Sequence, residues 1–265
     1  MNKKALELGL KNTHFETPHG LDSDKHYTTA YELALLANYA MNNKTFSKIV
    51  GTKEYTITIN GSPKQLTNTN ELLGNFDGVY GIKTGFTNGA NRCLVTACKR
   101  NNIDIICVVL GADTKKFRTQ DSVKLINYIF NNFKSINIEN IINKNFDNWK
   151  NKNLDKIILS KSTSKTIEFS IKPNIDCPIS TENCYIPVRK DLINNISVNI
   201  DCPLYFETPI HTNSKLGTIN VHVTDYCNFE YYIFNTAEIE HKSWNNYFLN
   251  FLKNYSNILL QFTSL

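Results

Sequence analysis

Hydrophobic and polar positions divide the chain into three stretches with different periodicity. In residues 1–133, helical spacing alternates with strand-like runs, which is typical of an α+β domain. Residues 134–240 contain only short β-like runs, rich in Ile and Asn, and predict a small all-β domain. Residues 241–265 return to helical spacing. The sequence therefore predicts an α+β domain, a second all-β domain and a C-terminal amphipathic helix.

In the first stretch, helices and antiparallel strands are expected. Thr28 or Thr29 is the expected N-cap of the second helix, because Glu32 stands where a capping box needs it relative to Thr29. Asn60-Gly61 and Asn101-Asn102 have the composition of tight turns at strand ends. The expected helices cover 2–9, 31–41 and 121–133, and the expected strands cover 55–59, 80–86, 92–98 and 103–110.

In the second stretch, strands are expected over 156–159, 166–171, 184–188, 197–200, 216–224 and 230–234. Asn-Ile-Asp-Cys-Pro occurs twice, at 174–178 and at 199–203. This short repeat indicates two equivalent strand ends rather than a binding site.

The tail has one aromatic and aliphatic face, opposite a face of Asn and Lys. Polar residues in every turn argue against a helix that spans a membrane. Two interpretations are open, packing on the β domain or an interfacial anchor, and we favour the anchor because the face has large aromatics and few charges. The apolar residues are Trp244, Tyr247, Phe248, Phe251, Leu252, Tyr255, Ile258, Leu259 and Phe262.

The charge balance narrows the possible ligands. The formal net charge is +5, and the whole excess falls in residues 1–133. Such a surplus suits a site for a small anionic substrate as well as general solubility, but there is no Arg-rich clustering, and we expect no nucleic-acid partner. We expect no export signal, since the apolar run after Met1 ends by residue 10.

Cysteines and histidines give no sign of a metal or redox site, and no cofactor is expected. The seven cysteines form no Cys-x-x-Cys pair, and the odd count leaves at least one free thiol. Cys93, Cys98 and Cys107 lie in apolar runs and are expected to be buried. His14, His19 and His26 share one loop and are interpreted as structural.

The candidate chemistry centres on Lys83-Thr84-Gly85, within an expected strand. Lys83 supplies a fixed positive charge near a nucleophile, Thr84 offers a hydroxyl to a substrate carboxylate, and Gly85 lets a substrate backbone approach closely. The backbone N–H of Phe86 can then point at a developing oxyanion. The triplet alone is a weak indication of an active site, so the sequence around it must decide whether it marks one.

That context resembles the serine-type D-Ala-D-Ala carboxypeptidases, the low-molecular-mass penicillin-binding proteins, over residues 1–133. Pro209-Ile210 and Lys215-Leu216-Gly217 are similar to the C-terminal β domain of that family, whose members often end in an amphipathic membrane helix. The matching segments are Met1-Asn2, Ala5, Leu8-Gly9, Asn12-Thr13-His14-Phe15, Pro18-His19-Gly20-Leu21-Asp22, His26-Tyr27-Thr28-Thr29-Ala30-Tyr31, Thr69-Asn70, Leu72-Leu73, Gly78-Val79, Gly81, Lys83-Thr84-Gly85, Thr87 and Cys93-Leu94-Val95.

The resemblance implies an incomplete penicillin-binding, serine β-lactamase-like domain and a hydrolase that trims peptidoglycan stem peptides outside the cytoplasm, at the membrane, and binds β-lactams. It also implies that Arg118, 35 residues beyond Lys83, helps hold the terminal carboxylate of the substrate. The alternative for Arg118 is an exposed charge at the start of a helix.

The catalytic residues of the family are not found upstream of Lys83. There the family has an acylated serine in Ser-x-x-Lys, on a helix, and a Ser-x-Asn. Ser162-x-x-Lys165, Ser135-x-Asn137 and Ser197-x-Asn199 all follow the triplet, on expected loops or strands, and are interpreted as chance matches.

We therefore expect the chain to be inactive alone. Three explanations are open: a truncated enzyme, a non-catalytic wall or membrane interaction module, and a split enzyme completed by a second chain that carries the nucleophile.

Overall fold

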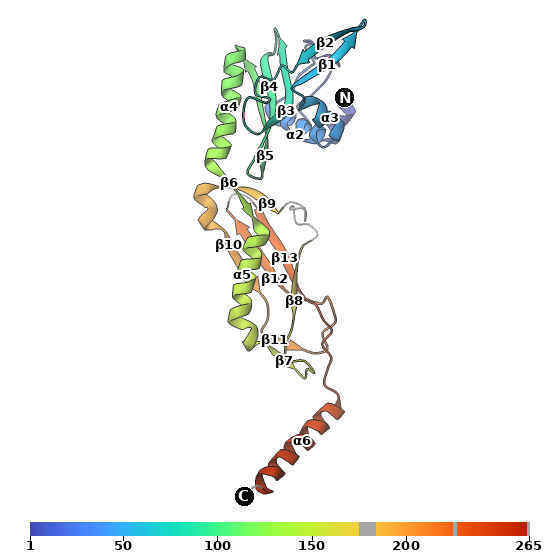
Figure 1. Ribbon diagram of the computed structural model, residues 1–265, viewed down its shortest axis with the longest axis vertical. Helices are drawn as coiled ribbons and strands as arrows, with labels where there is room; N and C mark the ends of the chain where they lie inside the picture. The colour runs from blue at the N-terminus through green and yellow to red at the C-terminus, as the bar shows by residue number, and fades with distance from the viewer. Residues whose placement is uncertain (175–183, 225–226, 264–265) are drawn as a thin grey trace. The chain divides into compact units, whose positions relative to one another are not determined.

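A computed structural model describes residues 1–174, 184–224 and 227–263 (Figure 1). The chain divides into two compact units, Met1–Ser135 and Ile136–Leu265. Strand β6 (Phe133–Asn137) carries the chain from the first unit into the second. The boundary expected near residue 134 falls within this strand. Of the repeated pentapeptide, residues 175–178 lie outside the described part.

The first unit is built on a three-stranded antiparallel sheet of β3 (Val79–Thr87), β4 (Asn91–Arg100) and β5 (Ile103–Ala112), in that order. Asn101 and Asn102 have φ values of 49° and 61°, the backbone that a tight hairpin between β4 and β5 requires. Because β3 is at the end of the sheet, one edge of it has no partner strand in the described chain.

Helices cover the two faces of this sheet. On one face, Ile126 of α4 (Lys115–Asn132) is fully buried in a cluster with Leu94 and Cys98 of β4. On the other, Ala37 of α2 (Ala30–Met41) packs with Ile82 and Ala97. Alternation along each strand sends neighbouring residues to opposite faces, so both helices have an apolar surface to pack on. Because the helices pack on both faces of the sheet, they hold β3 in position.

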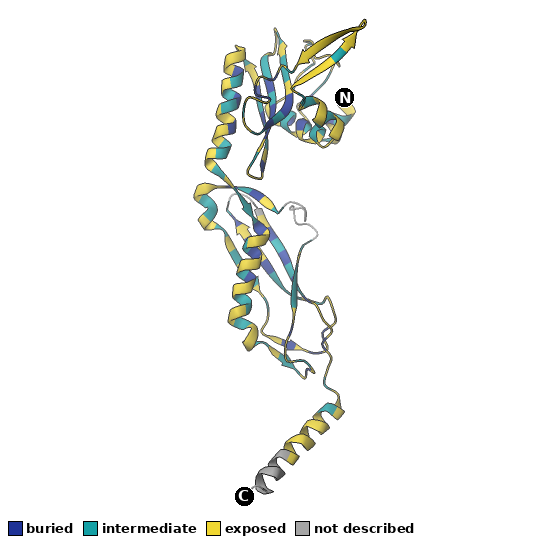
Figure 2. Cartoon of the chain, viewed as in Figure 1, coloured by how far each residue is buried: buried dark blue, intermediate teal, exposed yellow. Residues whose placement is uncertain are grey.

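Smaller elements complete the first unit. α1 (Asn2–Glu7) ends before Gly9, whose φ of +72° favours glycine. α3 (Lys44–Val50) follows α2, and β1 (Glu54–Ile59) pairs with β2 (Ser62–Thr67) around the expected Asn60-Gly61 turn. Figure 2 shows this hairpin as mostly exposed. Neither α3 nor β2 was predicted, because neither has a clear apolar period.

The largest difference between a predicted and an observed boundary is at the start of α4. Helix α4 begins at Lys115, six residues before the expected start at residue 121. Its N-cap is Thr114, whose Oγ1 accepts a hydrogen bond of 3.1 Å from the backbone N–H of Phe117. The first two turns are mostly polar, so hydrophobic spacing does not reveal them. As a consequence Arg118 lies inside the helix.

The second unit is built on a four-stranded antiparallel sheet in the order β10-β12-β13-β8. Its remaining strands include the parallel pair β7 and β11. The strands are β7 (Ile158–Ser160), β8 (Phe169–Pro173), β9 (Tyr185–Arg189), β10 (Ser197–Asp201), β11 (Tyr205–Glu207), β12 (Lys215–Val223) and β13 (Cys227–Asn235), and the 3₁₀ helices are η1 (Leu154–Lys156) and η2 (Lys190–Asn195).

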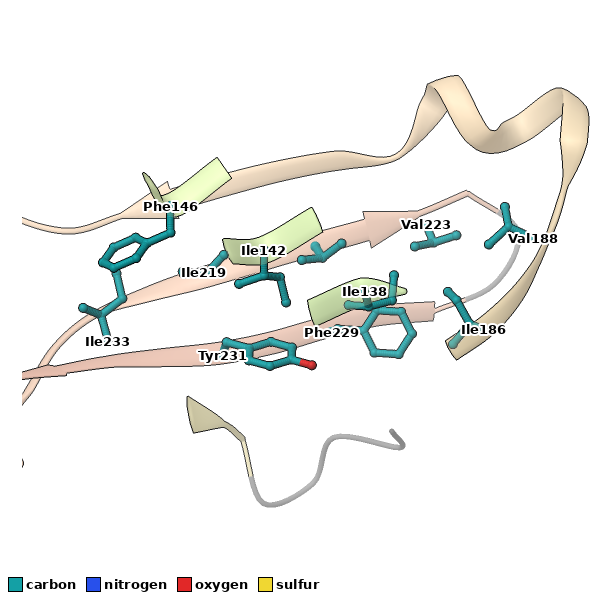
Figure 3. Close-up of a cluster of buried hydrophobic side chains, with 11 residues drawn as sticks. Ile138, Ile142, Phe146, Ile186, Val188, Ile219, Val223, Phe229, Tyr231 and Ile233 are labelled. Atoms are coloured by element: carbon teal, nitrogen blue, oxygen red, sulfur yellow. The ribbon is translucent and has the colours of Figure 1, made fainter. Parts of the chain in front are cut away.

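The expectation of an all-β second domain is wrong, because helix α5 (Ile138–Asn153) packs on this sheet. In Figure 3 the side chains of Ile138, Ile142 and Phe146 lie among those of β12 and β13. Asn137 caps the helix by accepting a 2.8 Å hydrogen bond from the N–H of Asn140. The apolar positions recur every four residues, but the many asparagines between them resemble loop sequence.

The C-terminal helix is present as α6 (Trp244–Thr263). Its aromatic side chains are exposed at Trp244, Phe248 and Phe251, and side chains beyond Ser256 lie outside the description, including those of Ile258, Leu259 and Phe262. Within the described residues, no helix combines the length and the apolar character needed to cross a membrane.

Candidate active-site wall

A cavity of about 730 Å³ opens beside the expected triplet, and we call it the Arg118 cavity. It brings together all five predicted site residues, which come from β3 and α4. Its lining contains no serine or cysteine among the described residues. The lining residues are Pro18, His19, Gly20, Thr67, Asn68, Thr69, Glu71, Lys83, Thr84, Gly85, Phe86, Arg92, Lys115 and Arg118.

The Thr84 side chain is held by a hydrogen bond to the hydroxyl of another threonine. Its Oγ1 lies 2.6 Å from Oγ1 of Thr69, so the two side chains share a hydrogen bond. The Lys83 ammonium donates to the backbone carbonyl of Thr84. The hydroxyl and the charge of the triplet are therefore both oriented before any ligand binds.

Asn70 fixes the segment that carries Thr69. Its side chain is 2% exposed, and its Nδ2 donates a 3.0 Å hydrogen bond to the carbonyl of Gly81 on β3. Its Oδ1 accepts from the backbone N–H of Leu72 at 3.2 Å. A buried amide is kept only where it is hydrogen-bonded, and here those bonds tie the loop to the strand.

Gly85 and Phe86 follow on the same strand. A Cβ added to Gly85 would meet only Cβ of Cys93, at 3.6 Å, which is an ordinary contact. The fold itself therefore does not require glycine at this position. Phe86 is exposed, and the guanidinium of Arg92, its register partner on β4, lies 3.4 Å above its ring.

Arg118 is buried, so the interpretation as an exposed helix-entry charge is wrong. It is 3% exposed, and its Nε has no hydrogen-bond partner in the described structure. Its Nη2 lies 3.8 Å from Oε2 of Glu71. A buried guanidinium with unmet donors is costly unless an anion approaches it. A guanidinium in this state is chemically suited to bind an anion.

The loop beside the cavity is tied to the sheet by Asp22, whose Oδ2 accepts a 3.0 Å hydrogen bond from the N–H of Gly89. Hydrogen bonds from Thr87 and from this backbone N–H lower the pKa of Asp22. The carboxylate thus joins the loop to the β3–β4 turn.

The three loop histidines have separate environments. His14 Nδ1 lies 2.6 Å from the carbonyl of Lys25, and His19 Nδ1 accepts from the N–H of Leu21 at 3.2 Å. His26 packs edge-on against Phe15. In the described part of the chain, no group of His, Cys, Asp and Glu has the arrangement of a metal site.

The serine patterns lie elsewhere. Ser162 forms an isolated β-bridge with His241, its Oγ accepts a hydrogen bond from the N–H of Ser164, and no helix brings Lys165 to it. The patterns at Ser135 and Ser197 begin on β6 and β10. None of these residues lines the Arg118 cavity.

Sequence reasoning assigned no role to Thr69, Glu71, Arg92 or Lys115, which also line the cavity. For Thr69 and Arg92 the sequence contains a signal that could have revealed their place in the site. Thr69-Asn70 is among the matching segments, and the hairpin pairs Arg92 directly with Phe86. Glu71 and Lys115 had none, since their place depends on how the loop and α4 pack.

Comparison with known proteins matches residues 1–114 to a family model described as D-alanyl-D-alanine carboxypeptidase. The D-alanyl-D-alanine carboxypeptidase DacF of Bacillus subtilis is 40% identical over 136 residues, which cover 51% of this chain and 35% of that protein. A D-alanyl-D-alanine carboxypeptidase of Streptomyces sp. strain K15 is 39% identical over 136 residues, covering 49% of this chain and 47% of that protein. The match thus spans about a third to a half of the length of these relatives.

Two solved structures share the fold over most of the chain. Penicillin-binding protein 5 of Haemophilus influenzae covers 91% of this chain and 64% of its own, with a TM-score of 0.54 and 22% identity. The D-alanyl-D-alanine carboxypeptidase DacD of Francisella tularensis covers 91% and 67%, with a TM-score of 0.50 and 21% identity. The expected α+β, penicillin-binding fold is confirmed.

Proposed function

Residues 1–114 belong to the serine-type D-alanyl-D-alanine carboxypeptidase family, the low-molecular-mass penicillin-binding proteins, and we propose that this chain supplies the carboxylate- and oxyanion-binding wall of such an active site. Its ligands are peptidoglycan stem peptides that end in D-alanyl-D-alanine, and β-lactams. The reaction it serves is the hydrolysis of the terminal D-alanine from such a peptide, outside the cytoplasm.

Buried Arg118 is the observation that carries the proposal. Arg118, whose Nε has no hydrogen-bond partner in the described structure, and Thr84 both line the Arg118 cavity. A terminal carboxylate accepts hydrogen bonds from a guanidinium and from a hydroxyl. Hydrogen bonds in which one partner is charged are stronger than those between neutral groups. The free edge of β3 offers backbone groups along which an extended peptide can lie.

Within that arrangement each residue has a role in acyl transfer. A serine oxygen attacks the peptide carbonyl, the resulting oxyanion accepts from the N–H of Phe86, and D-alanine leaves with a proton on its nitrogen. Water then cleaves the acyl-enzyme ester. Lys83 keeps a positive charge beside the nucleophile, and Arg118 with Thr84 holds the carboxylate.

We propose that the chain alone binds the peptide and forms no acyl-enzyme, because no serine lines the cavity among the described residues. Isothermal titration with N-acetyl-D-alanyl-D-alanine tests the binding. Arg118→Gln is expected to weaken it about 30-fold, the effect of losing about 2 kcal/mol of charge-assisted hydrogen bonding. The C-terminal amide of the dipeptide is expected to bind both proteins equally weakly.

Incubation with a fluorescent penicillin tests the second half of the proposal. No covalent band is expected from the isolated chain. A band that survives denaturation and maps to a serine would refute the proposed inactivity, while leaving the proposed family reaction standing.

A second cavity supports a split enzyme as the context of this wall. It has a volume of about 500 Å³ and shares Gly20, Gly85 and Phe86 with the Arg118 cavity. Its lining is largely apolar and includes Phe15, Leu21 and Leu33. A helix with Ser-x-x-Lys on one face fits such a surface. Adding a chain that carries this motif is expected to restore penicillin labelling, and Leu21→Asp is expected to prevent it.

The alternative, a non-catalytic wall or membrane interaction module, is favoured by α6. Its exposed aromatics, at Trp244, Phe248 and Phe251, are of the kind that enter a lipid interface. Co-sedimentation with liposomes is expected for the whole chain and not for Phe248→Asp/Phe251→Asp. Asn246→Asp/Asn250→Asp, on the polar face, is the matched control. Equal binding of the two variants would contradict membrane association through 241–265.

A further inference from the structure

Glu71 is the one acidic side chain in the lining of the Arg118 cavity among the residues that the structure describes. Every other charged side chain there is a cation, and these are Lys83, Arg92, Lys115 and Arg118. A cavity with four cations attracts anions of any kind, and more strongly the more charges they carry. The single carboxylate is therefore placed where it changes which anion is preferred.

The carboxylate of Glu71 lies beside the guanidinium of Arg118, the group that binds the ligand's carboxylate in the proposed function. Its Oε2 is 3.8 Å from Nη2 of Arg118, which is longer than a hydrogen bond but well within Coulomb range. The same oxygen accepts a 3.2 Å hydrogen bond from Oγ1 of Thr119, one residue further along α4. Glu71 thus offsets part of the charge of Arg118 without using up its donors.

The backbone holds Glu71 in this position. Asn70 and Leu72, on either side, are buried, and the carbonyl of Glu71 accepts a 2.9 Å hydrogen bond from Nδ2 of Asn75. The Glu71 side chain itself is 52% exposed. Its place beside Arg118 is therefore set by the loop, while the carboxylate remains in contact with solvent and with any ligand that enters.

We propose that Glu71 is a specificity-determining residue, which lowers the preference of the Arg118 cavity for doubly charged anions and so favours a ligand with a single carboxylate. The inference rests on the proposed function in that Arg118 is the carboxylate-binding group. Coulomb energy is proportional to the product of the charges, so Glu71 opposes a dianion twice as strongly as a monoanion. It acts on the charge of the ligand, not on its shape.

The test compares wild type and Glu71→Gln in the whole chain. Glutamine keeps the size of the side chain and an oxygen that accepts from Thr119. Isothermal titration at pH 8 uses inorganic phosphate, largely a dianion there, N-acetyl-D-alanyl-D-alanine, a monoanion, and the uncharged C-terminal amide of that dipeptide. We expect Glu71→Gln to bind the dipeptide about fivefold more tightly, phosphate about 25-fold more tightly and the amide equally.

Asp121→Asn is the matched control, because it removes one negative charge from the same helix as Arg118 and does not line the cavity. It is expected to change each affinity by less than about twofold. The gain in Glu71→Gln is expected to shrink in high salt, since the carboxylate is half-exposed. Thermal melts of all three proteins check that they are folded.

The outcomes separate this inference from the proposed function. If the dipeptide binds wild type and Glu71→Gln equally, or phosphate gains no more than the dipeptide, the role of Glu71 is refuted and the proposed function stands. If phosphate binds and gains as expected while the dipeptide binds neither protein, the charge effect of Glu71 stands and the proposed function falls.

Discussion

The hydroxyl oxygens of Thr69 and Thr84 lie 2.6 Å apart, so the threonine of Lys83-Thr84-Gly85 has a fixed partner in the loop before β3. A hydroxyl is both donor and acceptor, and one that accepts from a neighbour keeps its own proton free to donate. If Thr69 donates to Thr84, the Thr84 proton is directed at the ligand. Thr69 is then a positioning residue for the proposed carboxylate site.

Replacing Thr69 by Val tests this relationship. Valine has nearly the shape of threonine and lacks the hydroxyl, so we expect the affinity for N-acetyl-D-alanyl-D-alanine to fall about fivefold, the effect of one neutral hydrogen bond of about 1 kcal/mol. Titration calorimetry measures it. Thr58→Val, on the exposed hairpin, is the control and is expected to bind like wild type. Unchanged affinity in Thr69→Val would argue against the role.

Gly85→Ala separates what the fold needs from what the ligand needs. The added methyl group meets only Cβ of Cys93, at 3.6 Å, and the backbone there is not in the left-handed region. The melting temperature is therefore expected to stay within a few degrees of wild type. A peptide that lies along the edge of β3 loses its close approach, and we expect its affinity to fall more than about tenfold.

The opposite result would be informative as well. If Gly85→Ala binds the dipeptide as wild type does, the ligand does not approach β3 at this position. If the variant unfolds at a much lower temperature, glycine is needed for the fold, contrary to the geometry.

Helix α5 is expected to stabilise the second unit through Ile142, which is 1% exposed and packed in the cluster of Figure 3. Ile142→Ala removes buried methyl groups and leaves a cavity, so we expect a loss of about 3 kcal/mol in the free energy of unfolding. Both tryptophans, Trp149 and Trp244, belong to this unit, and their fluorescence in urea follows its unfolding. Lys144→Ala, on the exposed side of α5, is the control, and an equal loss in both variants would contradict this packing.

The sequence predicted β1 and the three strands of the central sheet of the first unit because their apolar residues alternate and their turns contain Asn and Gly. Through the family resemblance it also predicted five of the residues that line the Arg118 cavity, those at 83–86 and Arg118. It missed α5 because asparagines separate Ile138, Ile142 and Phe146, and it misplaced the start of α4 because a polar first turn has no period. Hydrophobic spacing indicates which face of a helix is buried, but it does not indicate at which residue the helix begins.

The burial of Arg118 shows a second limit. Charge and position in the sequence are compatible with either an exposed or a buried guanidinium. In the structure, the loop before β3 brings the Glu71 carboxylate to Arg118 and Thr119 near the beginning of α4. Such contacts join segments far apart in the chain, and no local pattern records them.

Glu32 gives a prediction for pH, because it joins α2 to the segment before the loop. Its carboxylate accepts from Oγ1 of Thr13 at 2.5 Å and from the backbone N–H of Asn12 at 2.9 Å. Burial works to raise the pKa of Glu32, but these hydrogen bonds outweigh it and leave the pKa below its usual value of 4.5. The folded state therefore holds Glu32 ionised more strongly than the unfolded state does.

A depressed pKa in the folded state contributes stability above about pH 4.5, and this contribution is lost as the pH falls through the lower folded pKa. Glu32→Gln is accordingly expected to be less stable than wild type at pH 7, with a difference that shrinks as the pH falls from 5 towards 3. Urea unfolding followed by circular dichroism measures the difference at each pH. Glu54→Gln, on the exposed strand β1, controls for the loss of one charge. A difference between wild type and Glu32→Gln that stays constant from pH 7 to pH 3 would show that the stabilising contacts of this side chain do not depend on its charge.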